Sequence, residues 1–271
     1  MIEVLKRQIS ALNNQNEKIN KLREFLQIMA LKNIYDKKAF NNIAFVGGTA
    51  LRIIFEINRF SEDLDFSVIN KKGYDFIKIT DNIAKFFQKN NIAVESSPKT
   101  KGNIHSVFFK FPNILRDLNL AVSKNQKLSV KLEVDTNPPS GWQTDIFPIN
   151  KTYLFSITAF DLPSMFATKL HACFFRKYTK GRDFYDLIWY LSKKIRPNIE
   201  LLNNAIFQTE RKNFKITESD ISQFLSDRLD KVDFNAAKKD VLKFLFNYEE
   251  TELINKKFIK NLISKNLFPE K

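Results

Sequence analysis

The chain has 271 residues, 44% of them hydrophobic, so it can form one large domain or two smaller ones with a substantial core. Its 44 Lys and Arg residues outnumber 30 Asp and Glu, and the net charge of +14 favours a nucleic-acid partner, although a lysine-rich surface that only aids solubility is the simpler alternative. The single cysteine excludes an internal disulfide, and the lack of an apolar leader or long apolar run predicts a cytoplasmic protein.

The first half of the sequence predicts helices and strands in mixed order. Apolar residues at three- and four-residue steps predict one or two helices over residues 2–33. The next elements expected are a strand at Ile43–Val46, a helix at Thr49–Ile57, a strand at Asp63–Ile69 and a helix at Tyr74–Lys89. Four further runs have the pattern of strands: Ile92–Glu95, His105–Phe111, Leu118–Ser123 and Leu128–Asp135.

The sequence Asn-Pro-Pro-Ser-Gly at 137–141 is the clearest break in the chain, because these residues favour turns. One more strand is expected at Tyr153–Ile157, and helices alone follow, at 161–178, 182–194, 198–208, 217–229, 233–247 and 251–264. Asp161 and Thr217 are candidate helix N-caps. We therefore expect an α+β fold with a mixed-sheet core domain over residues 1–160, which includes the N-terminal helix, and an all-helical domain over 161–271.

The segment AFVGGTALRIIFEINRFSEDLDF, at residues 44–66, combines two glycines with two carboxylates. Gly47, Gly48 and Thr49 follow a predicted strand, where backbone N–H groups can approach phosphate oxygens. Asp63 and Asp65 share one face of the next strand and could hold Mg²⁺ against a nucleoside triphosphate. Each part alone is typical of an ordinary turn, but the combination in this order predicts nucleotidyl transfer.

The strand SVKLEVDTN, at residues 129–137, carries charged residues on one face and apolar residues on the other. Glu133 is the candidate third carboxylate, which could complete a metal site and accept the proton of an attacking hydroxyl. Asp135 points the same way and is the alternative. An ordinary half-exposed strand is the simpler interpretation of this segment alone.

The later segment LPSMFATKLHACFFRKYTKGRDFYDL, at residues 162–187, brings a lysine and two aspartates close in sequence. Lys169 lies on an otherwise apolar predicted helix, from which it could reach a phosphate or simply extend to solvent. Asp183 and Asp186 follow a basic turn and share one face of the next helix. Asp183 could instead serve only as the N-cap of that helix.

Four segments taken together resemble the AbiEii/AbiGii-type nucleotidyltransferases, the toxin halves of bacterial abortive-infection and related toxin–antitoxin systems. They are FVGGTALR (45–52), RFSEDLDF (59–66), VKLEV (130–134) and KLHACFFRKYTKGRDFYDL (169–187), in the order of the family. The spacer between the glycines and the aspartates is slightly longer than is usual across the wider superfamily and is normal for this family.

The resemblance implies a polymerase-β-like core, a helical part that completes the active-site cleft, and the use of a nucleoside triphosphate with Mg²⁺ or Mn²⁺. It assigns Ser61 and Asp63 to the first catalytic motif and matches Lys169 and Asp186 to the family's lysine and late aspartate. The expected catalytic residues are Asp63, Asp65, Glu133, Lys169 and Asp186, with Asp63, Asp65 and Glu133 as metal ligands. The expected nucleotide-binding residues are Gly47, Gly48, Thr49, Arg52, Ser61, Lys169 and Asp183.

The expected activity is transfer of a nucleoside monophosphate to an RNA hydroxyl with release of pyrophosphate. The resemblance favours tRNA as the acceptor, because some family members modify its acceptor end, and it implies an antitoxin on a separate chain. The alternatives are a catalytically inactive protein that binds RNA or a partner, and a phosphotransferase that acts on a protein through the same site. The sequence leaves open the preferred nucleotide, the acceptor, the oligomeric state and whether a cognate antitoxin exists.

Overall fold

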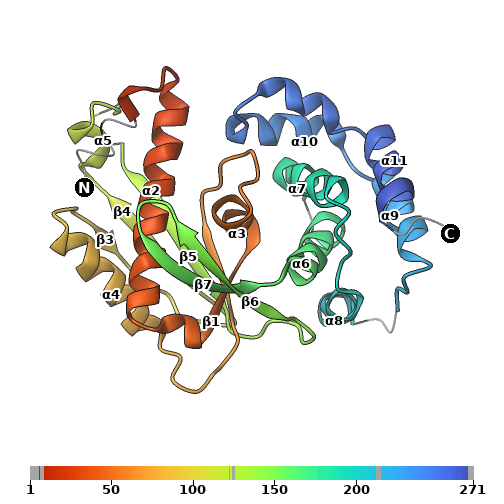
Figure 1. The fold of residues 1–271 in the computed structure, drawn as a ribbon, viewed down its shortest axis with the longest axis horizontal. Coiled ribbons are helices and arrows are strands. Elements are labelled where there is room, and N and C mark those ends of the chain that lie inside the picture. The colour runs from red at the N-terminus through yellow and green to blue at the C-terminus, as the bar shows by residue number, and fades with distance from the viewer. Residues whose placement is uncertain are drawn as a thin grey trace. The chain divides into compact units, whose positions relative to one another are not determined.

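The computed structural model describes residues 6, 9–121, 123, 126–176, 178–211 and 215–267. The chain forms two compact units (Figure 1). The first unit comprises Met1–Glu56, Phe60–Asn137 and Asp145–Ala159. The second comprises Ile57–Arg59, Pro138–Thr144 and Phe160–Lys271.

Among the described residues, seven strands form one mixed sheet in the order β3-β4-β5-β2-β1-β7-β6. The strands are β1 Ile43–Val46, β2 Leu64–Val68, β3 Glu95–Ser96, β4 Ile104–Phe111, β5 Leu128–Asp135, β6 Thr144–Asn150 and β7 Leu154–Phe160. β2 pairs antiparallel with β1 and parallel with β5, and β1 is parallel to β7. The centre of the sheet therefore contains the strands that carry, or directly precede, the candidate glycines and carboxylates.

The sheet has one apolar face, because residues along β4 and β5 alternate between buried and more exposed positions. Helices α2 (Gln15–Asp36) and α4 (Phe76–Lys89) cover that face. Phe87 of α4 packs its ring against Phe109 and Phe111 of β4, with ring centroids 6.2 and 5.0 Å apart. The opposite face of β5 carries its polar and charged residues.

Short helices connect the strands of this unit. The 3₁₀ turn η1 (Ala39–Asn41) leads into β1, and α3 (Gly47–Ile54) follows β1 without a linker and packs on β1 and β2. Helix α5 (Ile114–Asp117) lies between β4 and β5 in the sequence. Gly47 and Gly48 are therefore the first two residues of α3.

The described part of the second unit is helical after residue 160. Its α-helices are α6 Leu162–Phe175, α7 Gly181–Ser192, α8 Ile199–Glu210, α9 Ile221–Leu229, α10 Phe234–Val241 and α11 Lys256–Asn266, with 3₁₀ turns η2 Leu242–Phe244 and η3 Tyr248–Leu253. α7 packs on α6, α10 and α11. None of the helices in the described ranges of either unit is both long and apolar enough to cross a membrane.

Several sequence expectations need correction. The predicted strand at 118–123 is wrong within its described residues, because the chain there leaves α5 through Asn119, which has a φ of +56°, and forms no strand. β6 was missed because Pro148 lies inside it, and proline is typical only of edge strands such as this one. The predicted helix at 233–247 divides into α10 and η2.

One of the two predicted helix N-caps is confirmed and the other is wrong. Asp161 is confirmed as the N-cap of α6, since its carboxylate accepts a hydrogen bond from the Ser164 backbone N–H at 2.9 Å. The prediction of Thr217 as an N-cap is wrong, because α9 begins at Ile221 and Asp220 occupies the N-cap position. Residues 1–5, 7 and 8 of the predicted N-terminal helix lie outside the described residues, and α2 begins after Asn14.

Candidate active site

A tight turn joins β1 to α3 at the two glycines. Gly47 has a φ of +77°, which favours glycine over residues with a side chain. A Cβ atom on Gly47 would lie only 2.7 Å from Oδ2 of Asp65, so the missing side chain lets this carboxylate pack directly against the turn. Because the first backbone N–H groups of a helix have no partner within it, the start of α3 offers donors to an anion.

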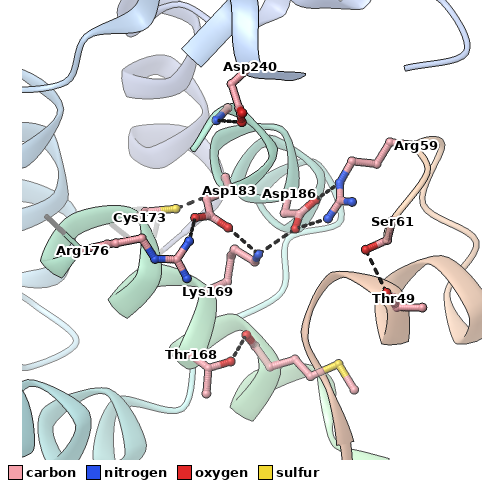
Figure 2. Close-up of polar contacts among 12 residues, drawn as sticks. Thr49, Arg59, Ser61, Thr168, Lys169, Cys173, Arg176, Asp183, Asp186 and Asp240 are labelled. Carbon is pink, nitrogen blue, oxygen red and sulfur yellow. Dashed lines mark hydrogen bonds and ion pairs between the residues drawn. The ribbon is translucent and has the colours of Figure 1, made fainter. Parts of the chain in front are cut away.

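The segment that precedes β2 is held by hydrogen bonds within the first unit. The Thr49 hydroxyl lies 2.9 Å from the Ser61 hydroxyl and also donates to the backbone carbonyl of Asp63, and Figure 2 shows the first of these contacts. The Gln27 side-chain amide of α2 donates to the carbonyls of Ser61 and Glu62 at 3.2 and 2.9 Å. The buried Thr49 side chain thus fixes the backbone that presents Asp63.

Two of the candidate carboxylates lie beside each other on adjacent strands. Asp65 of β2 is in register with Glu133 of β5, and both side chains are partly exposed. Glu133 also forms an ion pair with Lys131 on the same strand, with an N–O distance of 2.8 Å. Asp135 is in register with Ser67 instead, and burial raises the pKa of its carboxyl group. The register therefore distinguishes Glu133 from Asp135.

The described residues contain no cluster of three or more His, Cys, Asp or Glu side chains arranged to hold a metal ion. The available donors are the neighbouring carboxylates of Asp65 and Glu133, with Asp63 directly before β2. Mg²⁺ commonly binds one or two protein carboxylates together with water and substrate phosphates. This pair of carboxylates therefore fits that ion without a third protein ligand in place beforehand.

Arg52 of α3 contacts helix α2 within the first unit. Its Nε donates to the Glu24 carboxylate of α2 at 2.7 Å, and its guanidinium lies 5.6 Å from the ring centroid of Phe60. Burial would raise the pKa of Glu24, but Arg52 and Lys21 outweigh burial and lower it. Arg52 thus joins α2 to α3.

The second unit contains a cluster of five charged side chains, which we call the ionic cluster: Arg59, Lys169, Arg176, Asp183 and Asp186. Lys169 of α6 lies 2.8 Å from Oδ1 of Asp183 and 2.9 Å from Oδ2 of Asp186, both on α7. Figure 2 shows the Lys169 side chain directed at both carboxylates. Lys169 therefore does not extend to solvent, and Asp183 is more than a helix cap because Lys180 holds the N-cap position.

Two arginines complete the ionic cluster. Arg59 donates from Nε and Nη2 to the two carboxylate oxygens of Asp186, both at 2.6 Å, and the two side chains are 1% and 0% exposed. Arg176 contacts Oδ2 of Asp183 at 2.9 Å. Both aspartates are therefore bound by more than one cation, as buried carboxylates require.

The charges within the ionic cluster stabilise each other. Burial alone would lower the pKa of the Lys169 ammonium, but Asp183 and then Asp186 reverse this effect and raise it. Burial would raise the pKa of Asp183, yet Lys169 and Arg176 hold it below its usual value. Lys169 is therefore a fixed cation at neutral pH, and three basic side chains share two carboxylates.

The sequence interpretation missed Arg59 as a candidate site residue. A usable signal was present in α7, because Asp186 lies on the same helix face as Asp183, Leu187 and Tyr190, and a carboxylate on a largely apolar face needs a cation. Arg59, between Asn58 and Phe60 and close to the acidic segment, was one of many basic residues available. Only the folded chain shows which of them is paired.

Two crystal structures of Helicobacter pylori proteins share this fold. One protein, assigned as a nucleotidyltransferase, matches with a TM-score of 0.57 and 21% identity over 94% of this chain and 97% of its own. The other, JHP933, matches with a TM-score of 0.54 and 22% identity over 94% of each chain. The chain therefore shares the fold of these two proteins, with an α+β core and a helical C-terminal part.

The family comparison is more specific. The model of the family described as nucleotidyl transferase AbiEii toxin, type IV toxin–antitoxin system, matches residues 30–254. The chain therefore belongs to the AbiEii nucleotidyltransferase toxin family, which confirms the resemblance, and the protein is a nucleotidyltransferase. Among curated proteins, none has a sequence that matches this chain.

Proposed function

We propose that this protein transfers a nucleoside monophosphate from a nucleoside triphosphate to a hydroxyl group of RNA, with tRNA as the acceptor and Mg²⁺ as the metal. The observation that carries the proposal is the register of Asp65 beside Glu133, with the Gly47 turn packed against Asp65. The net charge of +14 supports a polyanionic acceptor.

In the proposed reaction, the acceptor oxygen attacks the α-phosphorus and forms a new phosphorus–oxygen bond. The bond between the α-phosphorus and the bridging oxygen breaks, and pyrophosphate leaves. Glu133 accepts the proton of the acceptor hydroxyl, since its carboxylate lies next to Asp65 and is partly exposed. We prefer Glu133 to Asp135 because Asp135 lies beside Ser67, away from Asp65.

The proposed triphosphate site is the start of α3. Backbone N–H groups of Gly47, Gly48 and Thr49 donate to phosphate oxygens. The Thr49 and Ser61 hydroxyls hold the segment before β2, so their proposed role is to orient Asp63. Arg52 supports the site through its contact with Glu24 of α2.

Asp63, Asp65 and Glu133 are the residues that we propose hold Mg²⁺ or Mn²⁺. Carboxylate oxygens are the donors that these ions prefer, and Gly47 leaves room for the Asp65 carboxylate at the turn. When bound, the ion would neutralise phosphate charge and favour departure of pyrophosphate.

We propose that Lys169 interacts with nucleotide phosphates as a fixed cation. Asp183 and Asp186 orient its ammonium group, which lies within 2.9 Å of both. Asp183 is the more direct nucleotide-binding candidate of the two, since Asp186 is fully buried against Arg59. Asp186 then acts as a positioning residue for Lys169.

The AbiEii family is a toxin family of type IV toxin–antitoxin systems, so we propose an antitoxin partner on a separate chain. The biological consequence of the proposed transfer is inactivation of the modified RNA. Expression of the chain alone would then arrest growth, and co-expression of the antitoxin would relieve the arrest.

The decisive experiment compares Asp63→Asn with the matched control Asp145→Asn, an exposed aspartate on β6 of the same unit. Each purified protein is incubated with Mg²⁺, total RNA and each α-³²P-labelled nucleoside triphosphate in turn. We expect wild type and the control to label an RNA band, and Asp63→Asn to lose at least about 100-fold in rate.

Equal labelling by Asp63→Asn and wild type would refute the assignment of Asp63. Parallel reactions with γ-labelled nucleotides test the phosphotransferase alternative, because only that reaction attaches the γ-phosphate to the acceptor. Labelled protein in place of labelled RNA would refute the proposed acceptor.

A further inference from the structure

The face of the sheet that carries Asp65 and Glu133 continues across β4, entirely within the first unit. β4 directs Val107 and Phe109 into the core, so the alternate residues Ser106 and Phe108 lie on the carboxylate face. Phe108 is 45% exposed, although most phenylalanines of this sheet are buried. An aromatic ring therefore lies on the same surface as the candidate catalytic carboxylates.

A lysine links this ring to the carboxylates. Lys131 of β5 is directly opposite Phe108 in the antiparallel register, and its Nζ lies 5.5 Å from the centroid of the Phe108 ring. The same Nζ lies 2.8 Å from Oε1 of Glu133. A cation beside an accessible aromatic ring is typical of sites where nucleobases stack.

The charge on this face changes sign across the strands. Lys110 follows Phe108 by two residues, and Lys99 pairs with Ser106 in an isolated bridge, so both belong to the Phe108 face. Glu95 is opposite Lys110, but Lys127 neutralises it at 3.0 Å. The face is thus basic toward β3 and β4 and acidic toward β2 and β5.

We infer that Phe108 and its neighbouring lysines form the binding site for the single-stranded 3′ end of the RNA acceptor. This inference rests on the proposed function. A base of the acceptor stacks on the Phe108 ring, while Lys99 and Lys110 contact backbone phosphates.

The spacing of the strands supports this assignment. Phe108 and Glu133 are diagonal neighbours in the register, about 7–8 Å apart. Asp65 lies one strand further, at about 4.8 Å from Glu133. A base on Phe108 therefore places the hydroxyl of an adjoining sugar within reach of Glu133.

The site is selective for unpaired RNA because a base within a duplex has no free face for the Phe108 ring. Stacking also tolerates any base, since every base presents a π-face. The site therefore accepts a free 3′ end of any sequence, and selection of one RNA among many depends on other contacts.

The test measures RNA binding without nucleotide or Mg²⁺, so its result does not depend on catalysis. Fluorescence anisotropy follows binding of a labelled ten-nucleotide single-stranded RNA, and of a blunt duplex of equal length, to wild type, Phe108→Ala, Phe108→Trp and Leu154→Ala. Leu154 is the control because it is an exposed apolar residue, 75% accessible, on β7 of the same unit.

We expect Phe108→Ala to weaken single-strand binding by about tenfold or more, and Phe108→Trp to retain it. Leu154→Ala should bind as wild type does, and the duplex should bind weakly to all four proteins. In a second variant, Lys99→Gln/Lys110→Gln, the slope of log K against log salt concentration should decrease by about 1.4.

Wild-type single-strand affinity in a folded Phe108→Ala protein would overturn the inference, as would equal losses for the duplex. Calorimetry with each nucleoside triphosphate and Mg²⁺ provides the remaining comparison. If Phe108→Ala lost nucleotide affinity and kept RNA affinity, the ring would belong to the nucleotide site, and the inference would be wrong while the proposed function stood. If wild type labelled no RNA in the nucleotide-transfer assay, the proposed function would instead be refuted and the RNA-binding measurement would be unaffected.

Discussion

The ion pair between Arg59 and Asp186 should contribute more to the folding stability of the second unit than any other contact of the ionic cluster. Arg59→Met keeps an unbranched apolar chain of similar length and removes both 2.6 Å contacts, which leaves the fully buried Asp186 carboxylate with Lys169 as its remaining partner in the cluster. Breaking a buried pair from one side typically costs about 3–5 kcal/mol, because one charge stays buried without its partner. That loss is a large fraction of the ~5–15 kcal/mol by which proteins of this kind are stable.

Urea unfolding followed by tryptophan fluorescence is a suitable assay, since Trp189 lies on α7 near Asp186 and Trp142 belongs to the same unit. With a slope of about 2 kcal/mol per molar urea, the midpoint should fall by about 2 M. The control Arg116→Met removes the exposed pair with Asp117 and should change the free energy of unfolding by less than about 1 kcal/mol.

Equal midpoints for Arg59→Met and the Arg116→Met control would refute the reasoning. The double variant Arg59→Met/Asp186→Leu offers a second check. It should recover part of the lost stability, because an apolar pair replaces the unpaired buried charge. A double variant that is less stable than Arg59→Met would show that Asp186 stabilises the unit through Lys169 alone.

Three further predictions follow from other contacts. Gly47→Ala should destabilise the first unit by about 1–3 kcal/mol in thermal unfolding and reduce nucleotide transfer, because its Cβ would lie 2.7 Å from Oδ2 of Asp65. The control Gly102→Ala should leave activity unchanged, because Gly102 has a similar φ of +81° but no neighbour within 4 Å of the added Cβ. Gly181→Ala should cost about 3 kcal/mol by calorimetry, because its Cβ would lie 1.8 Å from a backbone oxygen of α10. Because the folded pKa of Asp183 is below its unfolded value of about 3.8, its stabilising contribution should be present above that pH and lost in urea titrations as the pH falls below it.

Much of the fold could be predicted from periodicity. β1 and β5 have the predicted bounds. β1 is a short apolar run that ends at the two glycines, and buried residues alternate with more exposed ones along β5. The prediction of a strand at 118–123 failed because Leu120 is buried just after the short helix α5. A short apolar run does not by itself distinguish a strand from the end of a helix. The strand expected at Ile92–Glu95 lies too early in the sequence. β3 comprises only Glu95 and Ser96, the two residues that pair with β4.

The candidate site could be predicted only in part. Sequence spacing alone suggests that Asp183 and Asp186 share a helix face, and the contacts of Lys169 with both bear this geometry out. The register of Asp65 with Glu133 could not be predicted, because strands as far apart in sequence as β2 and β5 give no local signal of their pairing. The same is true of Arg59 and Asp186, whose contact depends on tertiary structure.

The route of the chain has a consequence for how the helical unit can be made. Arg59 precedes Asp186 by 127 positions, yet it belongs to the second unit. A fragment that begins at Phe160 lacks this arginine and would bury Asp186 without its bidentate partner. During synthesis on the ribosome, the arginine emerges early and must wait until α7 has left the exit tunnel before the pair can close. The helical unit is therefore not a separable module, and attempts to express, split or exchange it should carry the short segment Ile57–Arg59 along.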